Sequence, residues 1–276
     1  MRWKRALYTP LNRPGLRFLL AVAGTVHASL RARRLCTVRY ENCWIHRFPN
    51  AVLVEPEMLV PVYSELESMC SDIWNYQYQP QKGGVVLDIG AGTGWSTLFF
   101  SRSVGASGRV VSIEAHPVVF SCLRRMCFLN RLDNVTLSSM AVAATKSEVL
   151  ISDGWSHQAN STVGTTKGIC IQADTLDSIV SRLNLKRIDF LKMNIEGAEC
   201  HAIDGMSETV AKTLHVCISC HDFLADEGGD KQLRTKAKVI AFLTRQGFEI
   251  KVRSADPRPY IRDTVYGLNR ALSIAI

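Results

Sequence analysis

One stretch of the chain decides the fold: VVLDIGAGTG, at residues 85–94. Its first half is a nearly continuous apolar run, which is typical of a strand buried inside a parallel sheet. Three glycines follow, at Gly90, Gly92 and Gly94. Because glycine has no side chain, the backbone can turn sharply there, and a ligand can approach it at the start of the next helix. The stretch therefore predicts a strand, a ligand-binding turn and a helix.

The spacing of the glycines excludes two common nucleotide-binding motifs. A dinucleotide-binding turn has the pattern G-x-G-x-x-G, and counting from Gly90 puts Trp95 at the third glycine position. The P-loop pattern G-x-x-x-x-G-K-[ST] does not occur in the sequence. The pattern instead suits a nucleoside cofactor with an amino-acid tail. Asp88 and the turn at Ala91 would bind its ammonium and carboxylate, and Glu114, after the next predicted strand, would accept both ribose hydroxyls.

From Val85 onward, short β-rich runs alternate with helical patterns, which predicts a doubly wound α/β fold. We expect a Rossmann-like, mostly parallel seven-stranded sheet with helices on both faces, over residues 83–276. Residues 41–82 predict a strand at 51–54 and a helix at 62–74 that pack ahead of the first sheet strand, and residues 144–173 predict a small β insertion. The seven strands are expected at 85–89, 109–114, 135–139, 188–193, 214–219, 248–253 and 272–276.

The basic charge of the chain is concentrated at its start. The formal net charge is +8, yet residues 1–40 hold nine Lys and Arg and no acid, so the remainder carries −1. A nucleic-acid groove would need basic side chains spread along one face of the fold, which argues against a nucleic-acid partner. Residues 1–40 are therefore interpreted as a basic amphipathic N-terminal extension.

Three interpretations of this extension remain open. Apolar residues recur at helical spacing within residues 14–34, flanked by arginines, which fits a helix packed on the domain or a helix lying on an anionic membrane. A basic start, a short apolar stretch and small residues also fit a cleaved targeting segment. The apolar run from Phe18 to Val26 is too short to span a bilayer.

The nine cysteines are scattered and show no disulfide framework, which favours free thiols in a reducing compartment. We therefore expect a cytoplasmic protein, with peripheral membrane association through residues 14–34 left open. Cys217, Cys220 and His221 spell C-x-x-C-H, the pattern of covalent haem attachment. On a strand, residues three apart face opposite sides, so these two thiols cannot converge on one group.

Five motifs follow one another in the order and spacing of a known family. They are VVLDIGAGTGWST at 85–97, VSIEAHP at 111–117, ADTLDSIV at 173–180, IDFLKMNIEGAE at 188–199 and GMSETV at 205–210. Through these motifs the chain resembles the FkbM family of methyltransferases over roughly residues 83–222. The resemblance implies a class I methyltransferase fold, S-adenosylmethionine as cofactor, and O-methyl transfer to a hydroxyl of a sugar or natural-product-like small molecule. Carried over by position, Asp88, Gly90, Gly92 and Glu114 would hold the cofactor, with Asn134 and Ala141 near the adenine.

Two residues depart from the family pattern. Asn194 stands where the family commonly has Asp, and His221 stands where it has a glutamate after the fifth strand. With an unperturbed pKa of about 6.5, a histidine can take the proton of the acceptor at physiological pH. We therefore predict His221 as the general base, with Asn194 and Glu196 positioning the acceptor. A purely structural role for His221 stays open. No metal is predicted, and the alternative is a hard-metal site made by His221, Asp222 and Glu196.

Two other functions fit parts of the pattern. A non-catalytic protein could keep the fold and bind an adenosyl ligand, and only methyl transfer would distinguish it from the enzyme. A nucleotide-sugar or NAD enzyme would bind a different ligand, and Trp95 in the glycine turn disfavours it.

Overall fold

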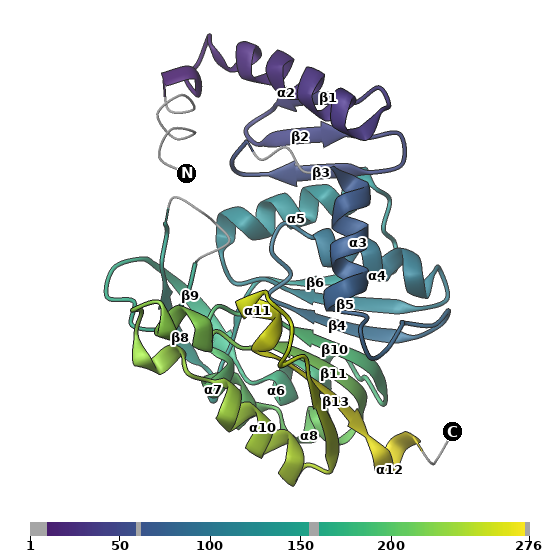
Figure 1. Ribbon diagram of the computed structural model, residues 1–276, viewed down its shortest axis with the longest axis vertical. Helices are drawn as coiled ribbons and strands as arrows, with labels where there is room; N and C mark the ends of the chain where they lie inside the picture. The colour runs from purple at the N-terminus through teal and green to yellow at the C-terminus, as the bar shows by residue number, and fades with distance from the viewer. Residues whose placement is uncertain (1–9, 59–61, 155–159, 274–276) are drawn as a thin grey trace.

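A seven-stranded sheet lies at the centre of the computed structural model, which describes residues 10–58, 62–154 and 160–273 (Figure 1). Its strands are β4 (Val85–Ile89), β5 (Arg109–Ile113), β6 (Val135–Ser138), β10 (Ile188–Met193), β11 (Thr213–Ser219), β12 (Phe248–Val252) and β13 (Thr264–Asn269). They are ordered β12-β13-β11-β10-β4-β5-β6. The pairs from β11 to β6 are parallel, and β13 is antiparallel to both neighbours. The predicted doubly wound, mostly parallel sheet is confirmed.

The prediction for the last strand is wrong. We expected it at residues 272–276, but it is β13, and helix α12 (Arg270–Ser273) follows it. Residues 274–276 lie outside the described residues. Gly267 interrupts the apolar pattern of β13, and the strand was therefore not predicted. A Cβ at this position would lie 2.8 Å from Val216 Cγ2 and 3.0 Å from Phe248 Cδ1, so glycine here permits close packing.

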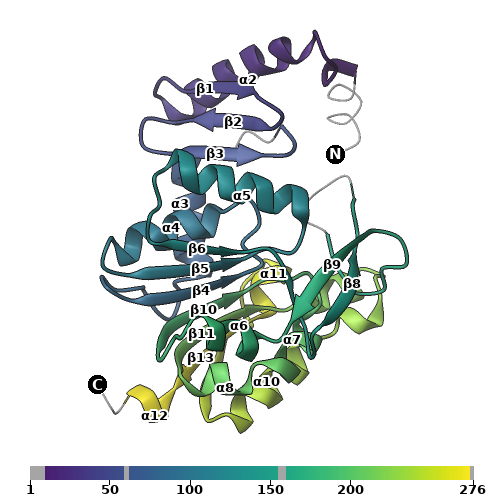
Figure 2. The same cartoon turned by 180° about the vertical axis from the view of Figure 1, so that it is seen from behind.

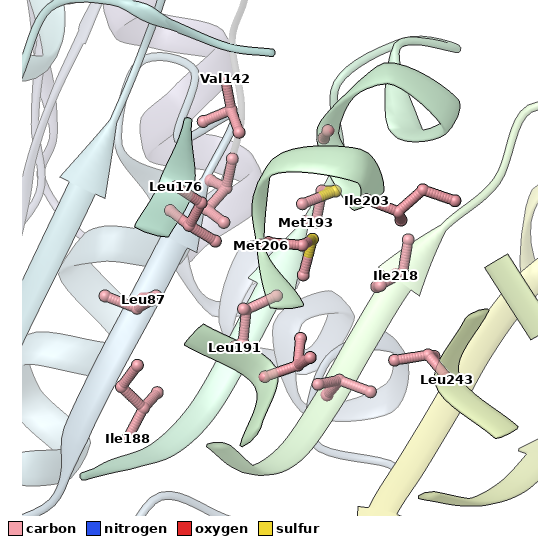
Figure 3. Packing of buried hydrophobic residues seen from close by; sticks show 14 of the residues in the cluster. Leu87, Val142, Leu176, Ile188, Leu191, Met193, Ile203, Met206, Ile218 and Leu243 are labelled. Carbon is pink, nitrogen blue, oxygen red and sulfur yellow. The ribbon is translucent and has the colours of Figure 1, made fainter. Parts of the chain in front are cut away.

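Helices cover both faces of the sheet, as predicted. Leu87 and Val86 of β4 point to opposite faces, because side chains alternate along a strand. Figure 3 shows the core on the Leu87 face, where Leu191 and Ile218 of neighbouring strands pack with Leu176. The helices are α2 (Arg17–Ala32), α3 (Tyr63–Ile73), α4 (Trp95–Val104), α5 (Pro117–Leu129), α6 (Leu176–Arg182), α7 (Glu199–Ala202), α8 (Ser207–Ala211), α9 (Asp222–Asp226), α10 (Lys236–Arg245) and α11 (Pro259–Arg262).

The predicted β insertion forms a small sheet of its own. It consists of β7 (Ala141–Val142), β8 (Ser147–Ile151) and β9 (Ile169–Asp174), in the order β7-β9-β8. Figure 2 shows β8 and β9 to one side of the seven-stranded sheet. Residues 155–159, which fall between β8 and β9, lie outside the described residues.

The N-terminal part of the chain builds more structure than expected. Only one strand was predicted there, but β1 (Thr37–Tyr40), β2 (Trp44–Arg47) and β3 (Val52–Glu55) form an antiparallel sheet. Helix α2 packs on β1, and β3 lies over α5 (Figure 1). Asn130 joins β3 to the end of α5, because its side chain accepts from Val52 N at 2.9 Å and donates to Val52 O at 2.6 Å.

All nine cysteines are free thiols, as predicted. Cys217 is buried in the core on one face of β11, and Cys220 is buried in the core on the other. The C-x-x-C-H sequence therefore cannot bind a haem or a zinc ion through both sulfurs. Among the described helices, none has the length and apolar character needed to cross a membrane.

Candidate active site

A cavity of about 450 Å³ lies where the carboxyl ends of β4, β5, β10 and β11 meet. In a doubly wound sheet this edge is the usual place for a ligand. Loops after these strands supply much of the wall, and α3 and the β7–β9 sheet close it from the sides. The predicted site residues that line it are Gly90, Ala91, Gly92, Glu114, Ala141, Asn194, Glu196 and His221.

The three glycines of the turn have different structural roles. Gly90 has φ +69°, and a Cβ there would lie 1.9 Å from Asn194 O, so glycine lets the loops after β4 and β10 touch. Gly92 has φ +58° and open space at the position of a Cβ, inside the cavity. Gly94 has φ +99°, but its missing Cβ would meet Met126 Cε at 2.2 Å. Gly94 therefore permits packing against α5 and does not line the cavity, contrary to the prediction.

Glu114 is held rigidly at the end of β5. It is buried, and its two carboxylate oxygens accept hydrogen bonds from Gly92 N and His116 N, each at 2.8 Å. Burial raises the pKa of Glu114, and the two N–H donors act in the opposite direction. The carboxylate thereby ties the glycine turn to β5 and still presents an acceptor to the cavity.

Asp88 lies beneath the cavity and does not line it. The residue is fully buried, and it accepts from Ser96 Oγ at 2.8 Å and Thr97 Oγ1 at 2.7 Å. Its other oxygen pairs with Lys192 Nζ at 3.0 Å, and Lys192 also donates to Gly90 O at 2.7 Å. The predicted direct contact of Asp88 with the cofactor is therefore wrong. Asp88 instead has an indirect role, because it fixes the start of α4 and binds Lys192, which in turn holds the glycine turn.

The structure does not bring Asn134 to the cavity. Asn134 immediately precedes β6, at the edge of the sheet opposite the cavity. Its side-chain nitrogen donates to Ser101 O at 3.0 Å and to Gly105 O at 2.8 Å, and its oxygen accepts from Ser101 Oγ at 2.6 Å. Asn134 thus caps the end of α4, and the prediction of an adenine contact is wrong.

The opposite wall carries what we call the acid–histidine cluster: Asn194, Glu196, Glu199 and His221. His221 Nδ1 lies 3.0 Å from Glu199 Oε1, and His221 Nε2 lies 3.3 Å from Glu196 Oε2. Asn194 Nδ2 donates to the other oxygen of Glu196 at 3.2 Å. Glu196 is the partly exposed member, and Glu199 is completely buried. The cluster thus links the cavity surface to the protein interior.

The surroundings of His221 change its expected charge. Burial lowers the pKa of His221, but the hydrogen bonds and charges of Glu196 and Glu199 outweigh this effect and raise the pKa to about 10. The prediction of His221 as the base assumed an ordinary pKa near 6.5, and its two carboxyl neighbours argue against that assumption. At neutral pH His221 is an imidazolium ion between two carboxylates, and an imidazolium ion cannot accept a proton.

The backbone at Glu196 adopts a left-handed conformation beside the cavity. Glu196 has φ +53°, a conformation that non-glycine residues rarely adopt and that often marks a functional position. Its carbonyl accepts from Ser161 Oγ at 2.6 Å, and the following Gly197 has φ +97°. The turn wraps around Glu199, whose Oε1 accepts from Gly197 N at 3.2 Å. The loop after β10 therefore orders both carboxylates.

The alternative metal site is not assembled. Asp222 turns away from the cluster, since its Oδ2 accepts from Thr235 N at 2.8 Å and Lys236 N at 2.9 Å at the start of α10. Within residues 10–58, 62–154 and 160–273, no group of three His, Cys, Asp or Glu side chains has the arrangement of a metal site.

Two acidic residues of the site were missed. Glu199 lies in the motif ending at residue 199, but only the fold shows that it pairs with His221. Glu55, at the end of β3, is fully buried and accepts from Thr93 Oγ1 at 3.0 Å and Trp95 Nε1 at 2.5 Å. The N-terminal sheet therefore supports the glycine turn, which no local sequence signal around Glu55 indicated.

Comparison with known proteins assigns the family. The model of the methyltransferase FkbM domain matches residues 88–250. The match covers more than half of the chain, which therefore belongs to the FkbM family of methyltransferases, a family that uses S-adenosylmethionine. No curated protein matches the chain in sequence.

Solved structures resemble the chain weakly. The methyltransferase FkbM from Methylobacillus flagellatus has 19% identity and a TM-score of 0.46, covering 68% of this chain and 44% of its own. This chain thus spans less than half of that protein. An O-methyltransferase from Bacillus cereus has 14% identity and a TM-score of 0.42, covering 75% and 80%. A fibrillarin from Methanococcus jannaschii has 13% identity and a TM-score of 0.47, covering 84% and 97%.

Proposed function

We propose that the protein transfers the methyl group of S-adenosylmethionine to a hydroxyl of a small molecule, and that Glu196 takes the hydroxyl proton. The observation that carries this proposal is the carboxylate of Glu196 at the cavity surface, paired with His221 at 3.3 Å. A hydroxyl must lose its proton when it is methylated, so O-methylation needs an acceptor of this kind.

The wall of the cavity formed by the glycine turn, Glu114 and Ala141 fits the cofactor. Gly92 leaves open space at a positive φ, where the bare backbone can meet the methionine part. Glu114 is the acceptor for the ribose hydroxyls, and Ala141 with Ile113 and Val142 offers an apolar surface for the adenine. When bound there, the cofactor supplies an electrophilic methyl group on a sulfonium. Gly90, Ala91 and Gly92 would hold it at the turn before α4.

The cluster prepares Glu196 for its role. Asn194 donates to one oxygen of Glu196 and His221 to the other, which fixes the orientation of the carboxylate. The acceptor hydroxyl donates its hydrogen to Glu196, and its oxygen is thereby aimed toward the methyl group. Transfer of the methyl group to the hydroxyl oxygen would break its bond to the sulfonium sulfur, leave S-adenosylhomocysteine and release the hydroxyl proton. Glu196 takes up this proton, and the charge of the cluster rises from −1 to 0. His221 keeps its proton throughout and acts as a positioning residue.

The remaining walls favour a small acceptor with an apolar face. Trp74, Trp95, Phe223 and Tyr260 line the cavity together with aliphatic residues. Aromatic rings can pack against the C–H faces of a sugar or the rings of a natural product. The polar groups of the two walls described above would fix the orientation of one hydroxyl.

The proposal is tested by methyl transfer from isotopically labelled S-adenosylmethionine to a panel of hydroxylated small molecules, read by product mass. With any acceptor that the wild type methylates, Glu196→Gln should lower kcat by about 10²- to 10⁴-fold. The dissociation constant of S-adenosylmethionine, measured by calorimetry, should not change. Glu227→Gln, the same substitution on an exposed loop, is the matched control. Near-normal turnover by Glu196→Gln would overturn the assignment of the base, and methylation of nitrogen alone would overturn O-methylation.

A further inference from the structure

Helix α2 packs on the molecule through its small and polar face. Gly24 and Ala28 are its buried residues, and a Cβ on Gly24 would lie 2.5 Å from Met58 Cε. Thr25 Oγ1 accepts from Val38 N at 2.8 Å, and Ser29 Oγ accepts from Cys36 N at 3.0 Å. These contacts fix the rotation of the helix on β1.

Leu20 of α2 packs against the core, but most of the other large apolar side chains of the helix point to solvent. They form what we call the outer stripe: Phe18, Val22, Val26 and Leu30, which are 61%, 59%, 55% and 73% exposed. Their spacing of four residues places them along one side of the helix, opposite Gly24 and Ala28. An ordinary surface helix has the reverse arrangement, with its large apolar residues inward. The outer stripe therefore has no partner within the part of the chain that the structure describes.

Positive charge surrounds the outer stripe. Arg13 precedes the helix, and Arg33 and Arg34 follow it, all of them exposed. Residues 10–40 contain no acidic residue. Helix α2 lies at one extremity of the molecule. It covers the side of the β1–β3 sheet that faces away from the seven-stranded sheet (Figures 1 and 2). Nothing of the catalytic core obstructs a flat surface approaching from that side.

We propose that α2 binds the surface of an anionic lipid bilayer, with the outer stripe inserted at the boundary of the acyl chains. An apolar stripe flanked by arginines is the pattern of an interfacial helix. At 16 residues, α2 is about 24 Å long, which suits a helix lying in the plane of the interface. A second copy of the chain is the poorer occupant, because two such basic surfaces would repel each other. The proposal is independent of the acceptor and of the chemistry at the cavity.

The test is co-sedimentation of the full chain with vesicles of phosphatidylcholine alone, or of phosphatidylcholine with phosphatidylserine. The wild type should bind the anionic vesicles and be released by high salt, since screening weakens the attraction. The double variant Val22→Asp/Val26→Asp should bind about a hundred-fold more weakly or not at all. Val252→Asp, the same change on β12 at the far edge of the large sheet, should bind as the wild type does.

A second variant separates charge from apolar contact. Arg33→Gln/Arg34→Gln should weaken binding to anionic vesicles by about five-fold for each arginine removed. Circular dichroism and the S-adenosylmethionine dissociation constant should match the wild type for every variant. A wild type that stays in the supernatant with anionic vesicles would overturn the proposal. A dimer that Val22→Asp/Val26→Asp dissociates, without any vesicle binding, would overturn it in favour of a second copy.

Discussion

The two polar walls of the cavity are built from different kinds of interaction. The glycine turn after β4 is shaped by backbone conformation, and Glu114 holds it through backbone N–H groups. The acid–histidine cluster on the other wall is held by charged side chains from two loops. A wall made of backbone is encoded by a short motif, because glycine is required wherever the chain turns or closely approaches another segment. A wall made of paired charges depends on residues that meet only in the folded protein.

The largest effect is expected from removing the charge at the centre of the cluster. His221→Gln leaves Glu196 and Glu199 facing each other without a cation, which should destabilise the fold by about 3–5 kcal/mol at neutral pH. The folded pKa of about 10 lies above the ordinary value of about 6.5, so the stabilisation is fully present below pH 6.5 and is lost as the pH rises through 10. Urea unfolding of both proteins should therefore show a difference that shrinks at alkaline pH. A constant difference would contradict the charged state of His221.

Gly90 is the point where the two walls touch, and its substitution should disturb both. Gly90→Ala would force a Cβ against the backbone of Asn194 at a positive φ, at an expected cost of about 2–3 kcal/mol. Gly92→Ala is the matched control, since it shares the positive φ but has open space, and it should cost about 1 kcal/mol. Thermal unfolding measures both. Equal losses would show that the close approach of the two loops is unimportant.

A smaller effect is expected from substituting Glu55, which supports the glycine turn from β3, outside the seven-stranded sheet. Glu55→Gln weakens the charge-assisted hydrogen bonds from Thr93 and Trp95. We expect about ten-fold weaker binding of S-adenosylmethionine, equivalent to about 1.4 kcal/mol, with little change in kcat. Calorimetric titration gives the dissociation constant. An unchanged constant would confine Glu55 to a role in packing the N-terminal sheet.

The fold was largely predictable because its central strands are mainly apolar. β4, β5, β10 and β11 are largely buried on both faces, so apolar residues predominate in their sequences. β13 escaped prediction because Gly267 breaks its pattern. In the N-terminal sheet, β1 (TVRY) and β2 (WIHR) escaped because polar residues interrupt their short sequences. The equally short β3 (VLVE) was predicted, because three apolar residues follow one another there.

The site was predictable in position but not in charge. Strand ends locate Glu114, Asn194, Glu196 and His221 at one edge of the sheet, and the structure brings all four to the cavity. Asp88 was predicted to contact the ligand because its actual partner could not be recognised from the sequence. That partner, the buried Lys192, lies about a hundred residues away in sequence. The pKa of His221 depends in the same way on Glu199, whose carboxylate reaches it only after the loop folds back. Local motifs cannot predict ion pairs between residues that meet only in the folded protein.

The most direct test of the cluster is the protonation state of His221, measured by nitrogen NMR of the histidine side chains in the full chain. The His221→Gln variant identifies the signal, and the titration runs from about pH 6 to pH 11. We predict an imidazolium at neutral pH that loses its proton near pH 10, which leaves Glu196 as the proton acceptor. A neutral imidazole at pH 7.5, with a pKa near its ordinary value, would contradict this account and restore His221 as the base.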